Sequence, residues 1–190
     1  LNPSISPLQQ GDLDSLCGIY AIINAIRLAA GTTTTKPTEK NLSYRGVRVL
    51  LEREVLGATL QNGLGAKNFR RLSKEIVKKA CQQTGLSFRT NRFDEAHKTP
   101  EDFFKHELLA GRPTCLRITG SIDHYTVLSG ITPTKLMLFD SVGLSWVKRS
   151  SFFPAVPEMP ARYGVDPRTI FSICLESGEN KDDPFFDELD

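Results

Sequence analysis

Apolar residues form one long block near the start of the chain and several short runs toward its end. From Leu16 to Ala30 almost every residue is apolar. Fifteen residues are too many for an ordinary strand, and apolar side chains on nearly every side are typical of a buried helix. Asp14 or Ser15 can cap its start, and Gly31 can end it. The pattern therefore predicts a central, buried helix over residues 16–30.

The next part of the chain is predicted to be helical as well. Residues 32–41 are polar and are interpreted as a loop, after which the apolar spacing favours a helix over residues 42–56. A further helix is expected over residues 66–84, before Gly85. Thr99 followed by Pro100 is a helix-start pattern, so a fourth helix is predicted over residues 99–110.

The predicted helix 66–84 has two contrasting faces. Its apolar residues recur at helical spacing and are Phe69, Leu72, Ile76 and Ala80. Its basic residues lie on another face and are Lys67, Arg71, Lys74 and Lys78. Basic helix faces are common where a helix meets solvent, so we interpret this one as solvated; the other reading is a contact with phosphate or an acidic partner.

After Gly111 the hydrophobic pattern changes to short runs of Val, Ile, Leu and Phe between turn residues, which indicates strands. The predicted strands are 113–119, 124–131, 135–140 and 168–176, with shorter ones at 87–89 and 144–148. Helices come first and a mostly antiparallel sheet second, which is an α+β order. The sequence therefore predicts an α+β domain over residues 1–176.

Charge is distributed unevenly along the 190 residues. Residues 177–190 hold six acids against one base and are predicted to be disordered or to dock a partner. Residues 1–176 carry 23 bases and 16 acids, an excess too mild to indicate nucleic-acid binding. No run of eighteen apolar residues and no signal-peptide pattern occurs. We expect no membrane or nucleic-acid partner and a cytoplasmic location; Leu1 in place of Met indicates a longer precursor.

The four cysteines are Cys17, Cys81, Cys115 and Cys174. They lie far apart and form no CxxC pair, so the spacing does not favour a zinc site, and no cofactor motif occurs. Cys115 and Cys174 fall in strand-like apolar runs, where a free thiol is the common state. We therefore expect free thiols, a reducing compartment and no cofactor.

Cys17 is the residue that carries the strongest chemical signal. A cysteine in the first turn of a helix feels the positive end of the helix dipole, which favours the reactive thiolate. Gly18 beside it permits a close approach of backbone or substrate. Upstream, the side-chain amide of Gln10 is a candidate donor to an oxyanion, together with the Cys17 backbone amide.

A thiolate enzyme needs a base and a group that orients it. His124 begins one predicted strand and Asp140 ends the next, so a hairpin brings them to the same edge of the sheet. His97 lies in a polar segment and His106 on a helix flank, and both are poorer candidates for the base. Each residue also has a purely structural interpretation: Cys17 in the core, His124 as a satisfied strand residue and Asp140 as a turn former.

Taken together, these segments resemble the papain-like cysteine peptidases. The likeness rests on Cys-Gly opening the central helix, Gly-Arg-Pro before a strand, His-Tyr-Thr-Val-Leu-Ser-Gly, and Leu-Phe-Asp-Ser. It covers residues 9–25 and 111–148 and is greatest with bacterial double-glycine leader peptidases and related effector proteases. The order Gln10, Cys17, His124, Asp140 agrees with that superfamily, whereas Leu16 stands where leader peptidases usually carry Asp.

The resemblance implies a papain-like fold and a cysteine protease that cleaves a protein or peptide through Cys17, His124, Asp140 and Gln10. It also admits an effector that is translocated into a target cell. The same thioester chemistry serves a glutamine deamidase, a transglutaminase-like enzyme or a deubiquitinase-like hydrolase, and these alternatives stay open. A binding module without activity is the remaining interpretation, although a pure binder has no need of all three triad residues.

Overall fold

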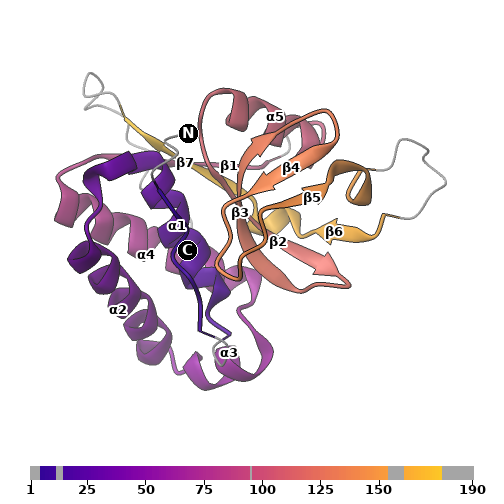
Figure 1. Cartoon of the computed structure of the whole chain (residues 1–190). Helices are drawn as coiled ribbons and strands as arrows, with labels where there is room; N and C mark the ends of the chain where they lie inside the picture. Colours follow the sequence, from indigo (N-terminus) through magenta and orange to yellow (C-terminus); the bar gives the residue numbers. More distant parts are fainter. Residues whose placement is uncertain (1–4, 12–14, 95, 154–160, 177–190) are drawn as a thin grey trace.

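Most of the helices gather in one half of the molecule and the strands in the other, where a further helix lies against the sheet (Figure 1). The computed structural model describes residues 5–11, 15–94, 96–153 and 161–176. Within these ranges the α-helices are α1 Cys17–Ala30, α2 Lys36–Glu52, α3 Leu56–Asn62, α4 Ala66–Thr84 and α5 Pro100–Leu109. The strands are β1 Phe88–Arg92, β2 Thr114–Gly120, β3 His124–Ile131, β4 Lys135–Leu138, β5 Trp146–Lys148, β6 Tyr163–Val165 and β7 Phe171–Leu175. Short 3-10 turns are η1 Gly31–Thr33, η2 Arg149–Ser151 and η3 Pro167–Thr169. The predicted α+β class is confirmed.

The seven described strands form one sheet in the order β1-β7-β2-β3-β4-β5, and β6 pairs with the far end of β2. Every pairing is antiparallel. Strand β7, the last in sequence, is inserted between β1 and β2, so it ties the segment after α4 to the C-terminal sheet. The mostly antiparallel sheet predicted from the sequence is confirmed.

Helix α1 is the centre of the larger of the two apolar cores. It packs against α2, α4 and the sheet strands β3 and β7, and its Ile22, Ile23 and Ile26 are fully buried. Gly46 of α2 permits a close helix contact, because a Cβ there would lie 3.0 Å from the Ile19 side chain. The buried central helix predicted for residues 16–30 is therefore confirmed, one residue shorter at its start.

Alternate side chains of the sheet enter two different cores. Cys115, Tyr125 and Val127 belong to the core around α1. Leu116 and Leu128, each one position further along its strand, belong to the second core, in which the phenylalanines of α5 are buried. Because successive residues of a strand point to opposite faces, the sheet is covered by α1 and α4 on one face and by α5 on the other.

Two predicted helices have the expected positions. Helix α4 matches residues 66–84, and its four predicted basic residues are all exposed to solvent. Helix α5 starts as predicted, since the Thr99 hydroxyl accepts a hydrogen bond from the Asp102 amide. This exposure is expected for a solvated face and equally for one that contacts phosphate or an acidic partner.

The loop prediction for residues 32–41 is wrong over its second half, because α2 already begins at Lys36. The Thr35 hydroxyl accepts from the Thr38 amide, and Pro37 stands in the first turn. This is the same cap-then-proline signal that predicts α5. It was missed because the segment around it is polar, although a solvated first turn needs no apolar residue.

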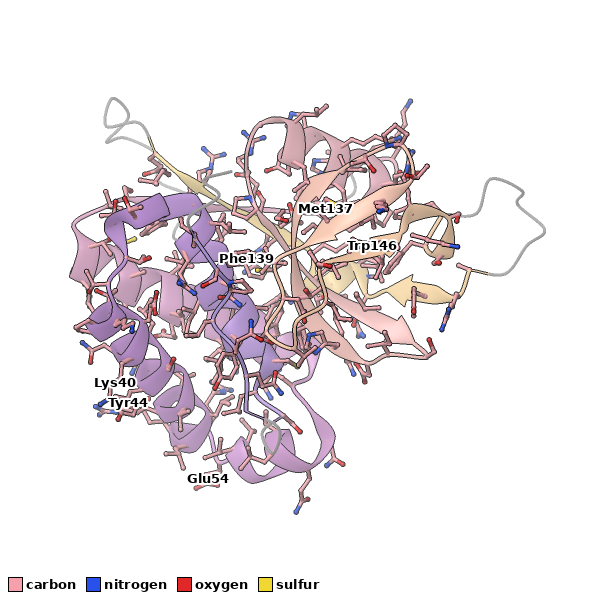
Figure 2. The ribbon with its side chains drawn as sticks, in the orientation of Figure 1. Lys40, Tyr44, Glu54, Met137, Phe139 and Trp146 are labelled. Carbon is pink, nitrogen blue, oxygen red and sulfur yellow. The ribbon has the colours of Figure 1, made fainter. Side chains whose placement is uncertain are left out.

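The single helix predicted over residues 42–56 is also wrong, because α2 ends at Glu52 and α3 starts at Leu56. Glu54, labelled in Figure 2, adopts a positive φ of 58°. The Glu54 and Val55 amides turn back to carbonyls of the last turn of α2, at Leu51 and Leu50. A helix end built on a left-handed residue normally uses glycine, so a glutamate there left no signal in the sequence.

Smaller differences concern the ends of elements. Ser15 does not cap α1, which starts after Leu16 without a side-chain cap, and Asp14 lies outside the described residues. The predicted strand 168–176 starts later, since η3 occupies Pro167–Thr169. Strand β6 was not predicted. The tail 177–190 lies outside the described residues.

Candidate active site

Cys17 is the first residue of α1, at the point where the helix emerges from the core. Its side chain is partly exposed and packs against the larger core. The first hydrogen bonds of the helix are donated by the Ile19 and Tyr20 amides to the Leu16 carbonyl. The Cys17 and Gly18 amides precede these bonds, so they point out of the helix start beside the sulfur. A thiol in this position can attack a substrate and offer its own amide to the resulting oxyanion.

His124 and Asp140 are brought together by the hairpin of β3 and β4. Leu128 pairs with Leu138, and the Phe139 amide donates to the Val127 carbonyl at 2.9 Å. In this register Asp140 lies level with position 126 and one diagonal step from His124. The predicted strand 135–140 is too long, because β4 ends at Leu138 and Asp140 stands two residues beyond it. The predicted neighbourhood of the two side chains is nevertheless observed.

The two side chains form a direct and buried hydrogen bond. Nε2 of His124 lies 2.7 Å from Oδ2 of Asp140. His124 is 8% exposed and Asp140 only 1% exposed. The second carboxylate oxygen, Oδ1, accepts from the Val142 amide at 2.9 Å. Both oxygens are thus engaged, which fixes the carboxylate and through it the plane of the imidazole ring.

The other ring nitrogen of His124 faces the thiol. The interactions that raise the pKa of His124 include one with the Cys17 thiol as well as those with Asp140, and because Nε2 is bound to Asp140, Nδ1 is the nitrogen left for the sulfur. Cys17, His124 and Asp140 therefore form one continuous chain of side chains. This chain joins the start of α1 to the edge of the sheet, so the two halves of the molecule meet at it.

The electrostatics of this chain favour a charged imidazole. Burial alone would lower the pKa of His124, but the hydrogen bonds to Asp140 and Cys17 outweigh it and raise the pKa to about 9. Burial alone would raise the pKa of Asp140, but the hydrogen bond from His124, the positive charge of that ring and the other hydrogen bonds to the carboxylate together outweigh it, so the net shift is downward. At neutral pH the pair is therefore an imidazolium bound to a carboxylate.

The other histidines and cysteines have different environments. His97 is bound to Asp94 at 2.9 Å and stacks edge-on against Phe103. His106 is exposed and bound to Glu107. Cys115 is fully buried, and burial raises the pKa of its thiol. Cys174 is partly buried, and burial likewise raises its pKa. Cys17 is the cysteine whose described contacts include a histidine.

Gln10 lies on the segment before α1, beside the loop that carries Asp140. Its backbone amide donates to the Ser141 carbonyl at 2.8 Å, and its Oε1 accepts from the Ser141 hydroxyl at 3.3 Å. Gln9, the other upstream glutamine, directs Nε2 toward the Asp140 carbonyl at 3.5 Å. Both glutamines therefore adjoin the residues that hold His124.

Asn24 anchors this N-terminal segment to α1. It is fully buried, its Oδ1 accepts from the Leu8 amide at 2.7 Å, and its Nδ2 donates to the Leu8 carbonyl at 3.2 Å. A side-chain amide that binds both backbone groups of one residue acts like a strand partner. These two bonds explain why a polar residue stands in the otherwise apolar helix. They also hold Leu8 in place, and Gln10 follows Leu8 by two residues.

The contact between Tyr125 and Leu64, which sequence reasoning missed, lies in the core beside Cys17. The Tyr125 hydroxyl donates to the Leu64 carbonyl at 2.7 Å, and its ring centroid lies 4.1 Å from that of Phe69. Gly18 lies against the side chains of Leu64 and Phe69. A Cβ at this position would lie 2.8 Å from the Leu64 side chain and 3.3 Å from the Phe69 ring. The small size of Gly18 thus admits side chains of the core. The motif His-Tyr was visible in the sequence, but nothing in it indicated the Leu64 contact.

Among the described residues, no cluster of three His, Cys, Asp or Glu side chains is arranged as metal ligands are. The described helices also include none with the length and apolar character needed to cross a bilayer. A comparison with protein-family models, curated proteins and solved structures finds no match for this chain.

Proposed function

We propose that this protein is a papain-like cysteine protease that cleaves a protein or peptide substrate. The observation that carries the proposal is the chain of interacting side chains from Cys17 through His124 to the buried Asp140. A purely structural role for Cys17 would not require a charged histidine beside it. A purely structural role for His124 would not require a thiol at its second ring nitrogen. The position of Cys17 at the start of a central helix that faces an antiparallel sheet agrees with a papain-like arrangement.

The reaction that we propose begins with the Cys17 sulfur as thiolate beside the imidazolium of His124. The sulfur attacks the substrate carbonyl carbon, and its C=O becomes an oxyanion held by the Cys17 amide and the Gln10 side-chain amide. When this intermediate collapses, the C–N bond breaks, and His124 gives its proton to the leaving amine. The acyl group remains on Cys17 as a thioester.

The second half of the reaction returns the enzyme to its starting state. Neutral His124 now takes a proton from a water molecule, whose oxygen attacks the thioester carbon. The C–S bond breaks, the product leaves as a carboxylic acid, and the sulfur and the imidazolium are again paired. Asp140 remains ionised throughout and keeps Nδ1 of His124 directed at the sulfur.

The same four residues would also hydrolyse the side-chain amide of a glutamine or an isopeptide bond to ubiquitin. All these reactions pass through a thioester on Cys17 and differ only in the amine that leaves. The identity of the released amine therefore separates the alternatives.

The decisive experiment incubates a cell extract with the protein and compares it with an extract that contains Cys17→Ala. New protein N-termini that appear only with the wild-type chain support the protease. Release of ammonia and a mass increase on glutamine residues, without new termini, would favour the deamidase, and shortening of ubiquitin chains would favour the isopeptidase. If wild type and Cys17→Ala give the same result in all three measurements, the protein is no thiol hydrolase.

A further inference from the structure

Two arginines from different elements converge on a small cavity away from the triad. Arg70 comes from α4, and Arg92 is the last residue of β1. The cavity has a volume of about 50 Å³. Its remaining walls come from η3, from the start of β7 and from the residue after β1, and the residues are Phe93, Pro167, Arg168, Ile170 and Phe171. The pairing of Arg92 with Phe171 across the β1–β7 ladder fixes one side of this cavity.

The described residues do not balance the charge of this cavity. Neither Arg70 nor Arg92 forms a side-chain hydrogen bond or an ion pair with the part of the chain that the structure describes. Arg168 is the third cation on the wall, but its guanidinium already binds both carboxylate oxygens of Asp166 at 2.9 Å. The described residues that line the cavity include no acidic side chain. Two positive charges therefore remain uncompensated.

Other arginines of this protein show what the usual arrangement is. Arg112 binds Glu107 through two nitrogens, and Arg117 binds Asp123 in the same way. Arg149 is paired with Glu101. Arg92 has no such carboxylate partner among the described residues. Its burial and, secondly, the positive charge of Arg70 lower the pKa of its guanidinium. Like charges held together in a partly buried cavity are unfavourable unless an anion joins them.

We infer that this cavity is a binding site for a tetrahedral oxyanion of the phosphate class, held by Arg70 and Arg92. The two uncompensated guanidinium charges match a phosphate dianion, and each guanidinium can give two parallel N–H donors to its oxygens. A water-sized oxygen needs roughly 10–15 Å³ of such a cavity, so about 50 Å³ suits a group with four oxygens. The apolar walls Phe93, Ile170 and Phe171 limit competing water and strengthen the charge interaction.

This site is independent of the proposed function, so its test uses binding alone. Full-length protein is titrated with inorganic phosphate at constant ionic strength, and the melting temperature and the line width of the phosphorus NMR signal are followed. In the wild type both should respond with saturation at roughly millimolar phosphate. Arg92→Gln should bind at least about tenfold more weakly, because charge-assisted hydrogen bonds are lost.

The matched control is Arg71→Gln, which changes the neighbouring, exposed arginine of the same helix outside this cavity. It should bind phosphate like the wild type, and any general stabilising effect of phosphate on the protein is then common to all variants. Without phosphate, Arg92→Gln should melt no lower than the wild type, because the substitution removes a repulsion. If it does not fold, Arg70→Gln, at an exposed position, serves in its place.

A parallel titration uses O-phosphoserine. Tighter binding of O-phosphoserine than of phosphate indicates a phosphate group carried on a larger ligand, and tighter binding of phosphate indicates the free ion. Either result supports the site. Three outcomes would overturn the inference. These are no saturable response in the wild type, an equal response in the wild type and Arg92→Gln, and acetate binding as tightly as phosphate.

Discussion

Nε2 of His124 lies 2.7 Å from Oδ2 of Asp140, and both side chains are almost fully buried. The same imidazole interacts with the Cys17 thiol at the start of α1. One histidine therefore links a carboxylate on the sheet edge to a thiol on the central helix. An ion pair buried at the meeting point of two halves is costly to desolvate, so its presence is more readily explained by chemistry than by stability.

The reactivity of the four cysteines should follow from their surroundings. We expect Cys17 to be alkylated by iodoacetamide at pH 7 roughly tenfold or more faster than the other three, because an ordinary thiol is only a few per cent ionised there. Mass spectrometry of the labelled peptides at early times gives the four rates. His124→Ala should reduce the rate at Cys17 toward those of the others. Equal rates at all four positions in the wild type would remove the basis for Cys17 as nucleophile.

The pH dependence of hydrolysis should report the charge on His124. The folded-state pKa of about 9 lies above the ordinary value of 6.5, so the imidazole is charged at neutral pH and loses this charge as pH rises through about 9. We expect kcat/KM to fall with an inflection near pH 9. Asp140→Asn should move this inflection toward neutral pH, since the carboxylate that raises the pKa is gone.

Asp94→Asn is the control for that measurement, because it removes the carboxylate of the other His–Asp pair, at His97. Its pH profile should equal that of the wild type. An alkaline limb that does not move in Asp140→Asn would contradict the assignment of Asp140.

The two upstream glutamines can be separated by substitution. Gln10→Ala should lower kcat by roughly a hundredfold with little change in KM, because a donor to the oxyanion acts mainly in the transition state. Gln9→Ala is the matched variant and should retain nearly full activity. Steady-state kinetics on a peptide substrate supply both constants, and a larger loss for Gln9→Ala would reverse the two roles.

Glu107 should be the most important charged residue for stability outside the triad. It is 2% exposed and accepts hydrogen bonds from Arg112, Ser172 and Asn91. Burial alone would raise its pKa, but these bonds outweigh it and lower the pKa from 4.5 to about 2. We expect Glu107→Gln to reduce the free energy of unfolding in urea by about 3 kcal/mol at pH 7.

The pH dependence gives a second, independent check on Glu107. Because its folded pKa is depressed, its contribution is complete above about pH 4.5 and is lost as pH falls through about 2. The difference between wild type and Glu107→Gln should shrink over that window. Glu75→Gln, which removes a solvent-exposed partner of Arg45, should cost no more than about 1 kcal/mol. A comparable cost for both variants would show that burial of Glu107 adds nothing.

The sequence by itself determined the class of fold and the candidate residues. Apolar side chains on all sides of residues 16–30 can only be buried, and alternating short runs after Gly111 can only pair as strands, so α1 and the sheet were predictable. The neighbourhood of His124 and Asp140 followed from hairpin geometry alone, because it depends on a contact close in sequence. The start of α2 after Thr35 was also predictable, because Thr35 and Pro37 form a cap-then-proline pattern, although the segment around them is polar.

Only the tertiary structure decided what depends on distant parts of the chain. The approach of Cys17 to His124 spans more than half the sequence and results from the packing of α1 on β3. The helix break at Glu54 arises because Glu54 adopts a left-handed backbone conformation, and the sequence has no glycine there that would indicate it. The meeting of Arg70 with Arg92 depends on how α4 packs beside the paired strands β1 and β7. Local patterns encode periodicity and turns, whereas such contacts follow from which buried faces fit together.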